Sequence, residues 1–302
     1  MSIEFSRLCE RFFRYMRLMR LDRPIGILLL LWPTLWALWL SAHGWPDGRV
    51  LWVFLLGTVL WWASTVLMRS AGCVMNDLAD RDFDPYVART KNRPLATGEV
   101  STKEACILSL VLVFLAFCLV LALRNWHLLD WSVIALFLAA TYPLTKRFLA
   151  IPQAYLGIAF GFGIPMAFVA QHGAVPPIAW ELLLANVFWA IAYDTEYAMV
   201  DRPDDLKIGI HTSAITFGRF DVVAVMICYA LTLGVIGGVG AQAGMGGAFY
   251  AGLAIAAAIA IYHFTLIRGR DPAKCFQAFM HNNWLGLSIF IGIVVDFSLS
   301  DR

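Results

Sequence analysis

The chain has 302 residues, of which 60% are hydrophobic and 15% are charged, and its mean hydropathy is +0.71. This profile excludes an ordinary soluble domain, in which about 25% of residues are charged. The net charge of +2 says little by itself, so the positions of the charges carry the information. We expect the chain to be surrounded by a lipid bilayer and to have no nucleic-acid partner.

Apolar segments long enough to cross a bilayer, about 20 residues, recur along the whole chain. They cover residues 25–42, 50–71, 104–123, 128–145, 152–171, 178–196, 222–241, 247–267 and 283–299. We therefore predict an all-α polytopic membrane protein, a bundle of nine transmembrane helices around a central cavity that opens to the cytoplasmic side. Residues 1–302 are predicted to form one membrane-embedded domain. It begins with a basic amphipathic arm (1–23) that lies on the membrane surface, and its two long cytoplasmic loops are 72–103 and 194–221.

The basic residues predict the orientation of this bundle. Twenty of the 23 lysines and arginines fall on one side if the spans alternate, and only Arg49, Arg124 and Arg302 fall on the other. Cytoplasmic loops carry such an excess. The sequence therefore predicts a bacterial-type inner membrane protein with a cytoplasmic N-terminus and its C-terminus on the opposite side.

The stretch NDLADRDFD, residues 76–84, places four acids beside long apolar segments. Each acid left at mid-bilayer costs about 2.5–3.5 kcal/mol, so these acids must lie at a membrane surface or in a wet cavity. Asn76, Asp80 and Asp84 recur every four residues and would share a helix face, with Asp77 near it. A stripe of oxygen ligands without His or Cys suits a hard cation such as Mg²⁺.

The stretch DTEYAMVDRPDD, residues 194–205, forms a second acidic cluster on the same side. Asp194, Tyr197, Asp201 and Asp205 follow one helical stripe. Pro203 leaves two alternatives, because the residue before a proline disfavours helix. Either the helix continues through the motif, or it ends near residue 202 and the last two acids, 204 and 205, belong to a turn.

Two sets of carboxylates facing one cavity, with cations nearby, form a site suited to a diphosphate, because Mg²⁺ completes its shell with water and phosphate oxygens. The candidate cations are Arg81, Lys91, Arg93, Lys146, Arg147, Arg202 and Lys207. No GxxxxGK[ST] loop is present, so a nucleoside triphosphate is not indicated.

These two stretches resemble the NDxxDxxxD and DxxYAxxDxxDD motifs of the UbiA superfamily of intramembrane aromatic prenyltransferases. The similarity is closest to the 4-hydroxybenzoate polyprenyltransferase branch, which acts early in ubiquinone biosynthesis. It extends to RLDRPIG (20–26), KNRPLATG (91–98), YPLTKR (142–147) and DDLKIGIHTSAITFG (204–218). Pro203 and His211 depart from the residues frequent in this branch.

The resemblance implies Mg²⁺-dependent transfer of a polyprenyl group from polyprenyl diphosphate to the ring carbon ortho to the hydroxyl of 4-hydroxybenzoate. One metal ion would be held by Asn76, Asp80 and Asp84, and a second by Asp201 and Asp205, with Asp77 and Asp204 as further ligands or their partners. The ions would neutralise the diphosphate, so that the allylic carbon–oxygen bond ionises and the ring attacks the cation.

The remaining roles are assigned to groups near these acids. Tyr142 and Tyr197 would stabilise the allylic cation, or they are interfacial belt aromatics. Asp194 would assist the phenol or accept the ring proton. For the benzoate carboxylate the candidates are Arg147, which the resemblance favours, Arg20 and Lys146; Lys91, Arg93 and Lys207 would meet the diphosphate.

Three other functions are compatible with parts of the pattern. A prenyltransferase of the same fold could use a naphthoate or a haem as acceptor. A membrane phosphatidyl-alcohol transferase would need a DxxDGxxAR motif, which NDLADRDFD lacks. A divalent-cation transporter would carry acids in mid-span, whereas here they gather at one membrane face.

Overall fold

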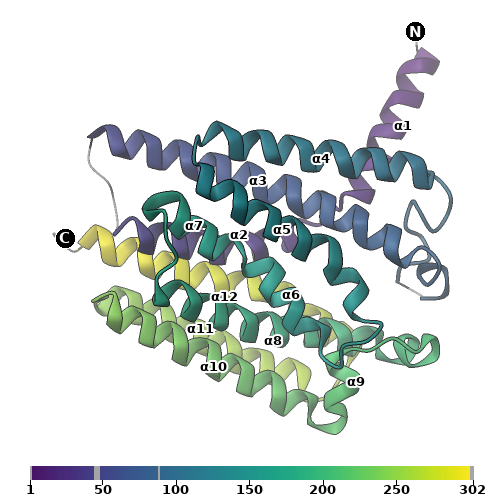
Figure 1. Ribbon diagram of the computed structural model, residues 1–302. Coiled ribbons are helices and arrows are strands. Elements are labelled where there is room, and N and C mark those ends of the chain that lie inside the picture. Colours follow the sequence, from purple (N-terminus) through teal and green to yellow (C-terminus); the bar gives the residue numbers. More distant parts are fainter. Residues whose placement is uncertain (1, 44–47, 88, 300–302) are drawn as a thin grey trace.

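The computed structural model describes residues 2–43, 48–87 and 89–299, and every regular element within these ranges is a helix (Figure 1). The longer helices are α1 (Ser2–Leu18), α2 (Ile25–Ser41), α3 (Gly48–Asp80), α4 (Thr102–Ala122), α5 (Trp126–Thr145), α6 (Pro152–Gly161), α7 (Gly163–His172), α8 (Pro177–Ile208), α10 (Asp221–Gln242), α11 (Gly247–Ile267) and α12 (Pro272–Leu299). The short elements η1 (Asp84–Tyr86), α9 (Ser213–Phe217) and η2 (Gly218–Phe220) lie in the connections. The predicted all-α class is confirmed.

Six stretches of the described residues are long and apolar enough to cross a membrane. They are Thr102–Ala122, Trp126–Thr145, Pro152–His172, Ser213–Gln242, Gly247–Ile267 and Pro272–Leu299, and Ile25–Ser41 is a shorter apolar helix. Each of the nine predicted segments overlaps a helix. The chain is thus a multi-pass membrane protein, and the number of nine crossings stays a prediction.

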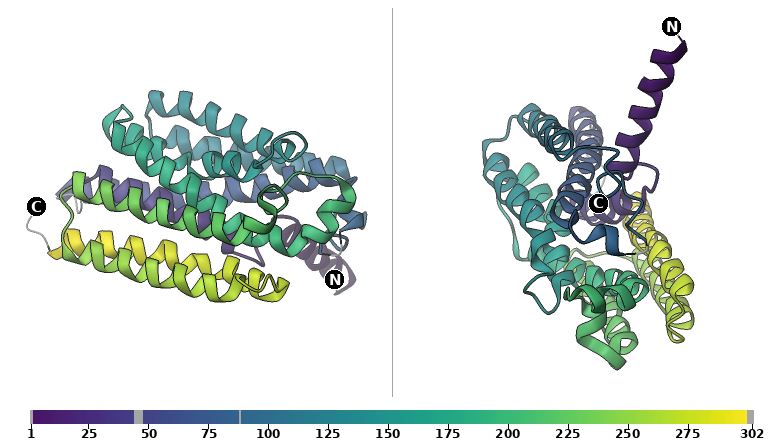
Figure 2. Two further views of the ribbon diagram at one scale, coloured as in Figure 1. Left: turned by 90° about the horizontal axis from the view of Figure 1, so that it is seen from below. Right: turned by 90° about the vertical axis from the view of Figure 1, so that its right-hand side faces the viewer.

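The helices of the bundle run roughly alongside one another, and α1 projects from one end (Figures 1 and 2). The connections that follow α3 and α8 lie at this same end, whereas α12 finishes at the other end (Figure 1). The two acidic segments are therefore brought to one end of the bundle, as their shared side of the membrane predicted.

Helix α2 forms the centre of the apolar core, since most of its residues are buried. The fully buried Trp36 of α2 packs against Trp189 of α8 with ring centroids 5.3 Å apart. Its indole Nε1 donates to the Gly286 carbonyl of α12 at 3.1 Å. Burying two indoles with a satisfied N–H stabilises this junction of three helices.

The predicted span 152–171 is a broken helix. Helices α6 and α7 are separated at Phe162. Pro165 lacks the N–H that would bond the carbonyl of Gly161, so one helical hydrogen bond is lost at this point. Gly163 permits close contact with α2, because a Cβ there would lie 2.3 Å from the Thr34 hydroxyl.

The first acidic motif does not lie on one continuous helix, which corrects the expected stripe. Helix α3 ends at Asp80, and Asp84 begins the separate turn η1. Pro85 disfavours helical geometry at Asp84 and so explains the interruption. The nominal loop 72–103 therefore begins with the last turns of α3.

The second motif is helical throughout, which settles the alternative that Pro203 left open. Helix α8 runs on to Ile208 with Pro203 inside it, and ends at Gly209, whose φ of 73° is left-handed. Residues 194–208, predicted as part of a loop, thus extend α8, and Asp201 and Asp205 share its helical spacing.

The second half of α1 is docked on the bundle. Leu18 is fully buried and packs with Val74 and Val100, and the hydroxyl of Tyr15 donates to Glu104 of α4 at 3.3 Å. Phe12 and Phe13 remain exposed. The membrane-surface role of this arm stays a prediction.

Candidate active site

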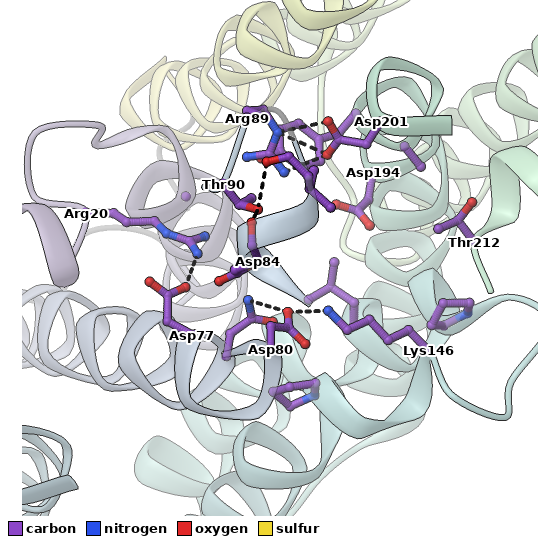
Figure 3. Close-up of a pocket in the computed structure, with 18 of the residues that line it drawn as sticks. Arg20, Asp77, Asp80, Asp84, Arg89, Thr90, Lys146, Asp194, Asp201 and Thr212 are labelled. Atoms are coloured by element: carbon purple, nitrogen blue, oxygen red, sulfur yellow. Dashed lines mark hydrogen bonds and ion pairs between the residues drawn. The ribbon is translucent and has the colours of Figure 1, made fainter. Parts of the chain in front are cut away.

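A cavity of about 550 Å³ lies where the two acidic segments meet. Its lining comes from the α1–α2 connection, the end of α3, η1 and the loop after it, the end of α5, the start of α6, α8 and α12. Segments that are far apart in the sequence thus contribute polar side chains to one space, part of which Figure 3 shows.

The first acidic cluster is held by arginines from outside its own helix. The carboxylate of Asp77 accepts from Arg20 at 2.5 Å and from Arg93 at 3.0 Å. Arg93 also donates to both oxygens of Asp84, at 2.8 and 3.0 Å. Asp77 and Asp84 are only 1% and 5% exposed, and the arginines offset part of the cost of burying their charges. Figure 3 shows the contact between Arg20 and Asp77.

Asp80 is the least satisfied acid of this cluster. Its Oδ2 forms an ion pair with Lys146 and accepts from Asn76 Nδ2 at 3.2 Å. Its Oδ1 is buried and has no hydrogen-bond partner among the described residues. A buried carboxylate oxygen without a partner is costly, so this atom marks a position for a donor or a cation.

The second cluster is closed by Arg89, which lies in the loop after η1. Its guanidinium donates to both oxygens of Asp201, at distances of 2.6 to 3.0 Å, and lies 4.4 Å from the ring centre of Tyr197 (Figure 3). Such a bidentate pair is stronger than a single contact. The loop that follows the first motif is therefore tied to the helix of the second.

Two carboxyl groups of the cavity, Asp84 and Asp205, have raised pKa values. Burial raises the pKa of Asp84 above its ordinary value, although Arg93 opposes the shift. For Asp205, burial and the neighbouring charge of Asp201 raise the pKa to about 7. In both cases the loss of water around the buried carboxyl group outweighs the nearby positive charge.

Most of the predicted site residues line this cavity. They are Arg20, Asn76, Asp77, Asp80, Asp84, Arg93, Tyr142, Lys146, Asp194, Tyr197, Asp201 and Asp205. The hydroxyl of Tyr142 lies 3.4 Å from Asn76 Oδ1, to which it donates. Their chemical roles stay predictions, but the structure brings them together.

Six predicted residues do not line the cavity. One of them, Arg202, forms an ion pair with Asp221. Arg81 pairs with Asp82 at 3.3 Å, and Lys207 pairs with Asp204 at 3.0 Å. Lys91 is exposed, and Arg147 is exposed and donates to the Ala79 carbonyl at 2.8 Å. These positions do not support the assignment of the benzoate carboxylate to Arg147.

Sequence reasoning overlooked Arg69 of α3. Its guanidinium lies on the cavity, 5.7 Å from the ring centre of Phe160, and its Nη1 donates to Cys73 Sγ. Its Nε is buried and has no hydrogen-bond partner within the described part of the chain. Among the described residues it has no ion pair. A Cβ on Gly26 would lie 2.3 Å from this Nε, so the glycine makes room for the arginine. The available signal was its position seven residues before Asn76, on the same helix face.

A smaller, mostly apolar cavity of about 160 Å³ adjoins the first. Its walls come mainly from α2, α3, α4, α5 and α7, and it shares Arg69, Tyr142 and Phe160 with the polar cavity. Polar and apolar spaces therefore meet at these three side chains.

The donor set fits a hard divalent cation. Within the described residues, no three His, Cys, Asp or Glu side chains are grouped as ligands of one ion, because the carboxylates contact arginine and lysine instead. Mg²⁺ needs only one or two protein carboxylates when water and phosphate complete its shell. The partnerless oxygen of Asp80 and the carboxylates of Asp77 and Asp84 provide such ligands.

The comparison with known proteins agrees with this geometry. Residues 30–286 match the UbiA prenyltransferase family, and the chain belongs to that family. Proteins named 4-hydroxybenzoate octaprenyltransferase from Dechloromonas aromatica (strain RCB) and Azoarcus sp. (strain BH72) are each 66% identical to it. The alignments cover 99% of both chains in the first case, and 96% of this chain and 98% of the relative in the second.

Solved structures share the fold. The apo structure of a UbiA homolog from Aeropyrum pernix K1 has a TM-score of 0.77 and 26% identity, covering 89% of this chain and 97% of the other. A UbiA homolog from Archaeoglobus fulgidus, described as bound to GPP and Mg²⁺, has a TM-score of 0.68 and 20% identity, covering 93% and 99% of the two chains.

Proposed function

We propose that this protein transfers a polyprenyl group from polyprenyl diphosphate to 4-hydroxybenzoate, as an early step of ubiquinone biosynthesis, and that it requires Mg²⁺. The observation that carries the proposal is the single cavity onto which both acidic motifs and several cations converge. The name of the 66% identical relatives supports 4-hydroxybenzoate as the acceptor and an octaprenyl chain as the donated group.

The metal would be held by oxygen ligands on two sides of the cavity. We assign Asn76, Asp77, Asp80 and Asp84 to one side, and Asp201 and Asp205 to the other. Bound Mg²⁺ would neutralise diphosphate oxygens and so stabilise the leaving group. Asp204 lies off the cavity lining and would act only through its neighbours.

The cations of the lining would bind and orient the diphosphate. Arg20, Arg89, Arg93 and Lys146 each form an ion pair with a carboxylate. With a metal ion held by those carboxylates, the four cations would be free to bind phosphate oxygens, to which arginine binds bidentately.

The prenyl chain would extend from the polar cavity into the adjoining apolar one. Phe160 and Tyr142 lie at the junction of the two spaces. They would flank the allylic carbon and exclude water from it while the carbon–oxygen bond breaks. The electron pair of that bond leaves with the diphosphate, and the aromatic ring faces of Tyr142 and Tyr197 would stabilise the allylic cation.

The acceptor would be oriented by Arg69 at its carboxylate. This cation has no carboxylate partner among the described residues and sits where the two cavities meet. The ring carbon ortho to the hydroxyl forms the new bond to the prenyl C1, and Asp194 would accept the proton that this carbon loses. Arg69 here replaces the earlier candidate, Arg147.

The setting of the reaction completes the proposal. We infer a single catalytic domain over residues 1–302, in a bacterial inner membrane, with the cavity and the N-terminus on the cytoplasmic side. The convergence of both motifs at the end of the bundle from which α1 leaves supports this orientation (Figure 1).

A product assay tests the proposal. Purified protein in lipid receives octaprenyl diphosphate, Mg²⁺ and 4-hydroxybenzoate, a dihydroxynaphthoate or a haem, and products are identified by mass spectrometry. We expect 3-octaprenyl-4-hydroxybenzoate. Prenylation of another acceptor alone would contradict the acceptor assignment, and no prenylation of any acceptor would contradict the transferase function.

A further inference from the structure

Helix α8 carries a second acidic site on the face turned away from the cavity. Glu196 lies between the motif residues Asp194 and Tyr197, yet it does not line the cavity and is fully buried. Its partners come from α10, α11 and α12. A buried carboxylate inside a membrane protein is costly unless it is fully hydrogen-bonded. We therefore expect Glu196 to have a structural or functional role.

The carboxylate of Glu196 joins four helices. Its Oε1 accepts from the Tyr229 hydroxyl of α10 at 3.0 Å, and its Oε2 accepts from Asn282 Nδ2 of α12 at 2.9 Å. His263 Nδ1 of α11 lies 3.5 Å from Oε1. All of these partner side chains are at most 1% exposed, so water does not compete for the bonds.

Asn282 holds α8 at a second point. Its Oδ1 accepts from the indole Nε1 of Trp189 at 2.8 Å. Trp189 precedes Glu196 by seven residues, which is about 10 Å along a helix. Two contacts spaced along α8 and made by one amide fix both the rotation and the depth of the helix.

The number of protons that Tyr229 can donate limits which hydrogen bonds this network forms at one time. The Tyr229 hydroxyl lies within 3.0 Å of three groups, namely Glu196 Oε1, Asn282 Oδ1 and His263 Nδ1, but has only one proton to donate. It can therefore donate to only one of them at a time, and any further hydrogen bond must be one that its oxygen accepts. The amide of Asn282 is oriented by Trp189, which can only donate.

A rotation of α8 at this network would displace the residues that α8 contributes to the cavity. A rotation of α8 by about 20° would move a carboxylate ~6 Å from the helix axis by roughly 2 Å. A misplacement of about 1 Å can reduce a rate roughly 100-fold. Around the helix, Asp194 lies about 160° and Tyr197 about 100° from Glu196, so any rotation permitted at Glu196 displaces both of them.

We propose that Glu196 is a positioning residue, which acts together with Tyr229, His263 and Asn282. It fixes the rotation of α8 and thereby the orientation of the Asp194 and Tyr197 side chains in the cavity. The proposal rests on the proposed prenyl transfer, because Asp194 and Tyr197 matter only if the cavity catalyses it. Glu196 itself touches no substrate.

Substitution of Glu196 tests this role. Glu196→Ala removes the carboxylate that accepts from Tyr229 and Asn282, and we expect kcat to fall about 10-fold or more while KM for the prenyl diphosphate stays within ~3-fold. Glu196→Gln keeps one acceptor and gains a donor for the Tyr229 oxygen, so it should restore kcat to within ~3-fold of wild type. Rescue by glutamine, and a kcat effect separate from KM, would not follow from a loss of stability alone.

Asp296→Asn is the matched control. Asp296 is another buried acid, and it accepts from the Gly246 N–H at 2.8 Å, near the end of α12 remote from the cavity. The control should lower the melting temperature and leave kcat per folded molecule unchanged. If Glu196→Ala behaves like this control, the positioning role is refuted. If Glu196→Ala does not fold, Tyr229→Phe replaces it, and unchanged kcat in that variant refutes the role.

A distance measurement separates this proposal from the reaction itself. Spin labels are placed at the exposed positions Asp82 and Leu206, in a variant whose accessible cysteines are replaced by serine. They report the placement of α8 relative to the turn between α3 and η1. The distance distribution should shift or broaden in Glu196→Ala and recover in Glu196→Gln. An unchanged distribution overturns the proposal whether or not wild type forms product, whereas a wild type without product counts against the proposed function alone.

Discussion

The protein buries carboxylates on both faces of α8, and it compensates them in different ways. The cavity acids Asp77, Asp80, Asp84 and Asp201 are held by the cationic ends of long arginine and lysine side chains. On the opposite face, Glu196 is held by a phenol, an amide and an imidazole that are themselves fully packed.

The difference divides the buried acids into those that can change their hydrogen-bond or ion-pair partner, which we call exchangeable, and those that keep it, which we call fixed. A flexible cation can leave a carboxylate when a metal ion arrives, and it can then bind phosphate. The partners of Glu196 are enclosed by helices, lie off the cavity lining and are hydrogen-bonded among themselves, so they do not meet a ligand bound in the cavity. The cavity acids can therefore change partners during a reaction cycle, while Glu196 keeps α8 in place.

The largest expected effect comes from removing the metal. EDTA should abolish product formation, because the cavity acids then remain paired with arginine and lysine and the diphosphate charge is not neutralised. Mg²⁺ should restore the reaction, and Ca²⁺ should restore it less well, because Ca²⁺ prefers more ligands at longer distances. Turnover that persists in EDTA would contradict the exchange of partners.

Asp80→Ala should lower kcat by roughly 10²- to 10³-fold, on the scale of losing one preorganised electrostatic contact. The change removes the partnerless oxygen and leaves Lys146 without its carboxylate. Asp82→Ala is the matched control within the same motif, because Asp82 is exposed and pairs with the exposed Arg81. Equal losses in the two variants would show that the motif acts through its overall charge.

Arg69→Ala should raise KM for 4-hydroxybenzoate by about 10- to 100-fold, since a hydrogen bond to a charged group contributes roughly 1.5–3 kcal/mol. KM for the prenyl diphosphate should change little. Arg81→Ala removes an exposed cation nearby and serves as the control. If KM for 4-hydroxybenzoate is unchanged in Arg69→Ala, the carboxylate of the acceptor must be bound by another cation of the cavity lining.

The expected effect of pH on metal binding is smaller than the effects of these substitutions, and it tests whether Asp205 is a metal ligand. Burial and the charge of Asp201 raise the pKa of Asp205 to about 7, so this group is neutral below that pH and becomes a ligand above it. KM for Mg²⁺ should therefore rise by up to about tenfold as the pH falls from 8 to 6. Asp205→Asn should flatten this dependence, and an equally steep profile in that variant would exclude Asp205 as its source.

The sequence predicted the membrane class and the meeting of the two acidic motifs well. Long apolar segments and the one-sided distribution of acids are large signals, because charge in lipid is costly. Spacing by four also placed Asn76 and Asp80 on one face of α3. Most of the predicted site residues consequently line one cavity.

The remaining features depend on tertiary contacts that spacing does not encode. Arg93, rather than a continuous helix, holds Asp84, since α3 stops before Pro85. Pro203 lies inside α8, although a proline locally disfavours helix, because packing can override local preference. The partners of Glu196 lie 33, 67 and 86 residues further along the chain, so periodicity could not identify them.

The most direct test of this account is a structure of the protein in lipid with Mg²⁺ and an unreactive prenyl thiolodiphosphate. We predict metal bound to oxygens of Asp80 and Asp84, Lys146 and Arg93 turned from those carboxylates to the diphosphate, and the bonds of Glu196 to Tyr229 and Asn282 unchanged. A bound diphosphate with the ion pairs of Lys146 and Arg93 intact and no metal on Asp80 or Asp84 would contradict the central claim that the cavity carboxylates are exchangeable.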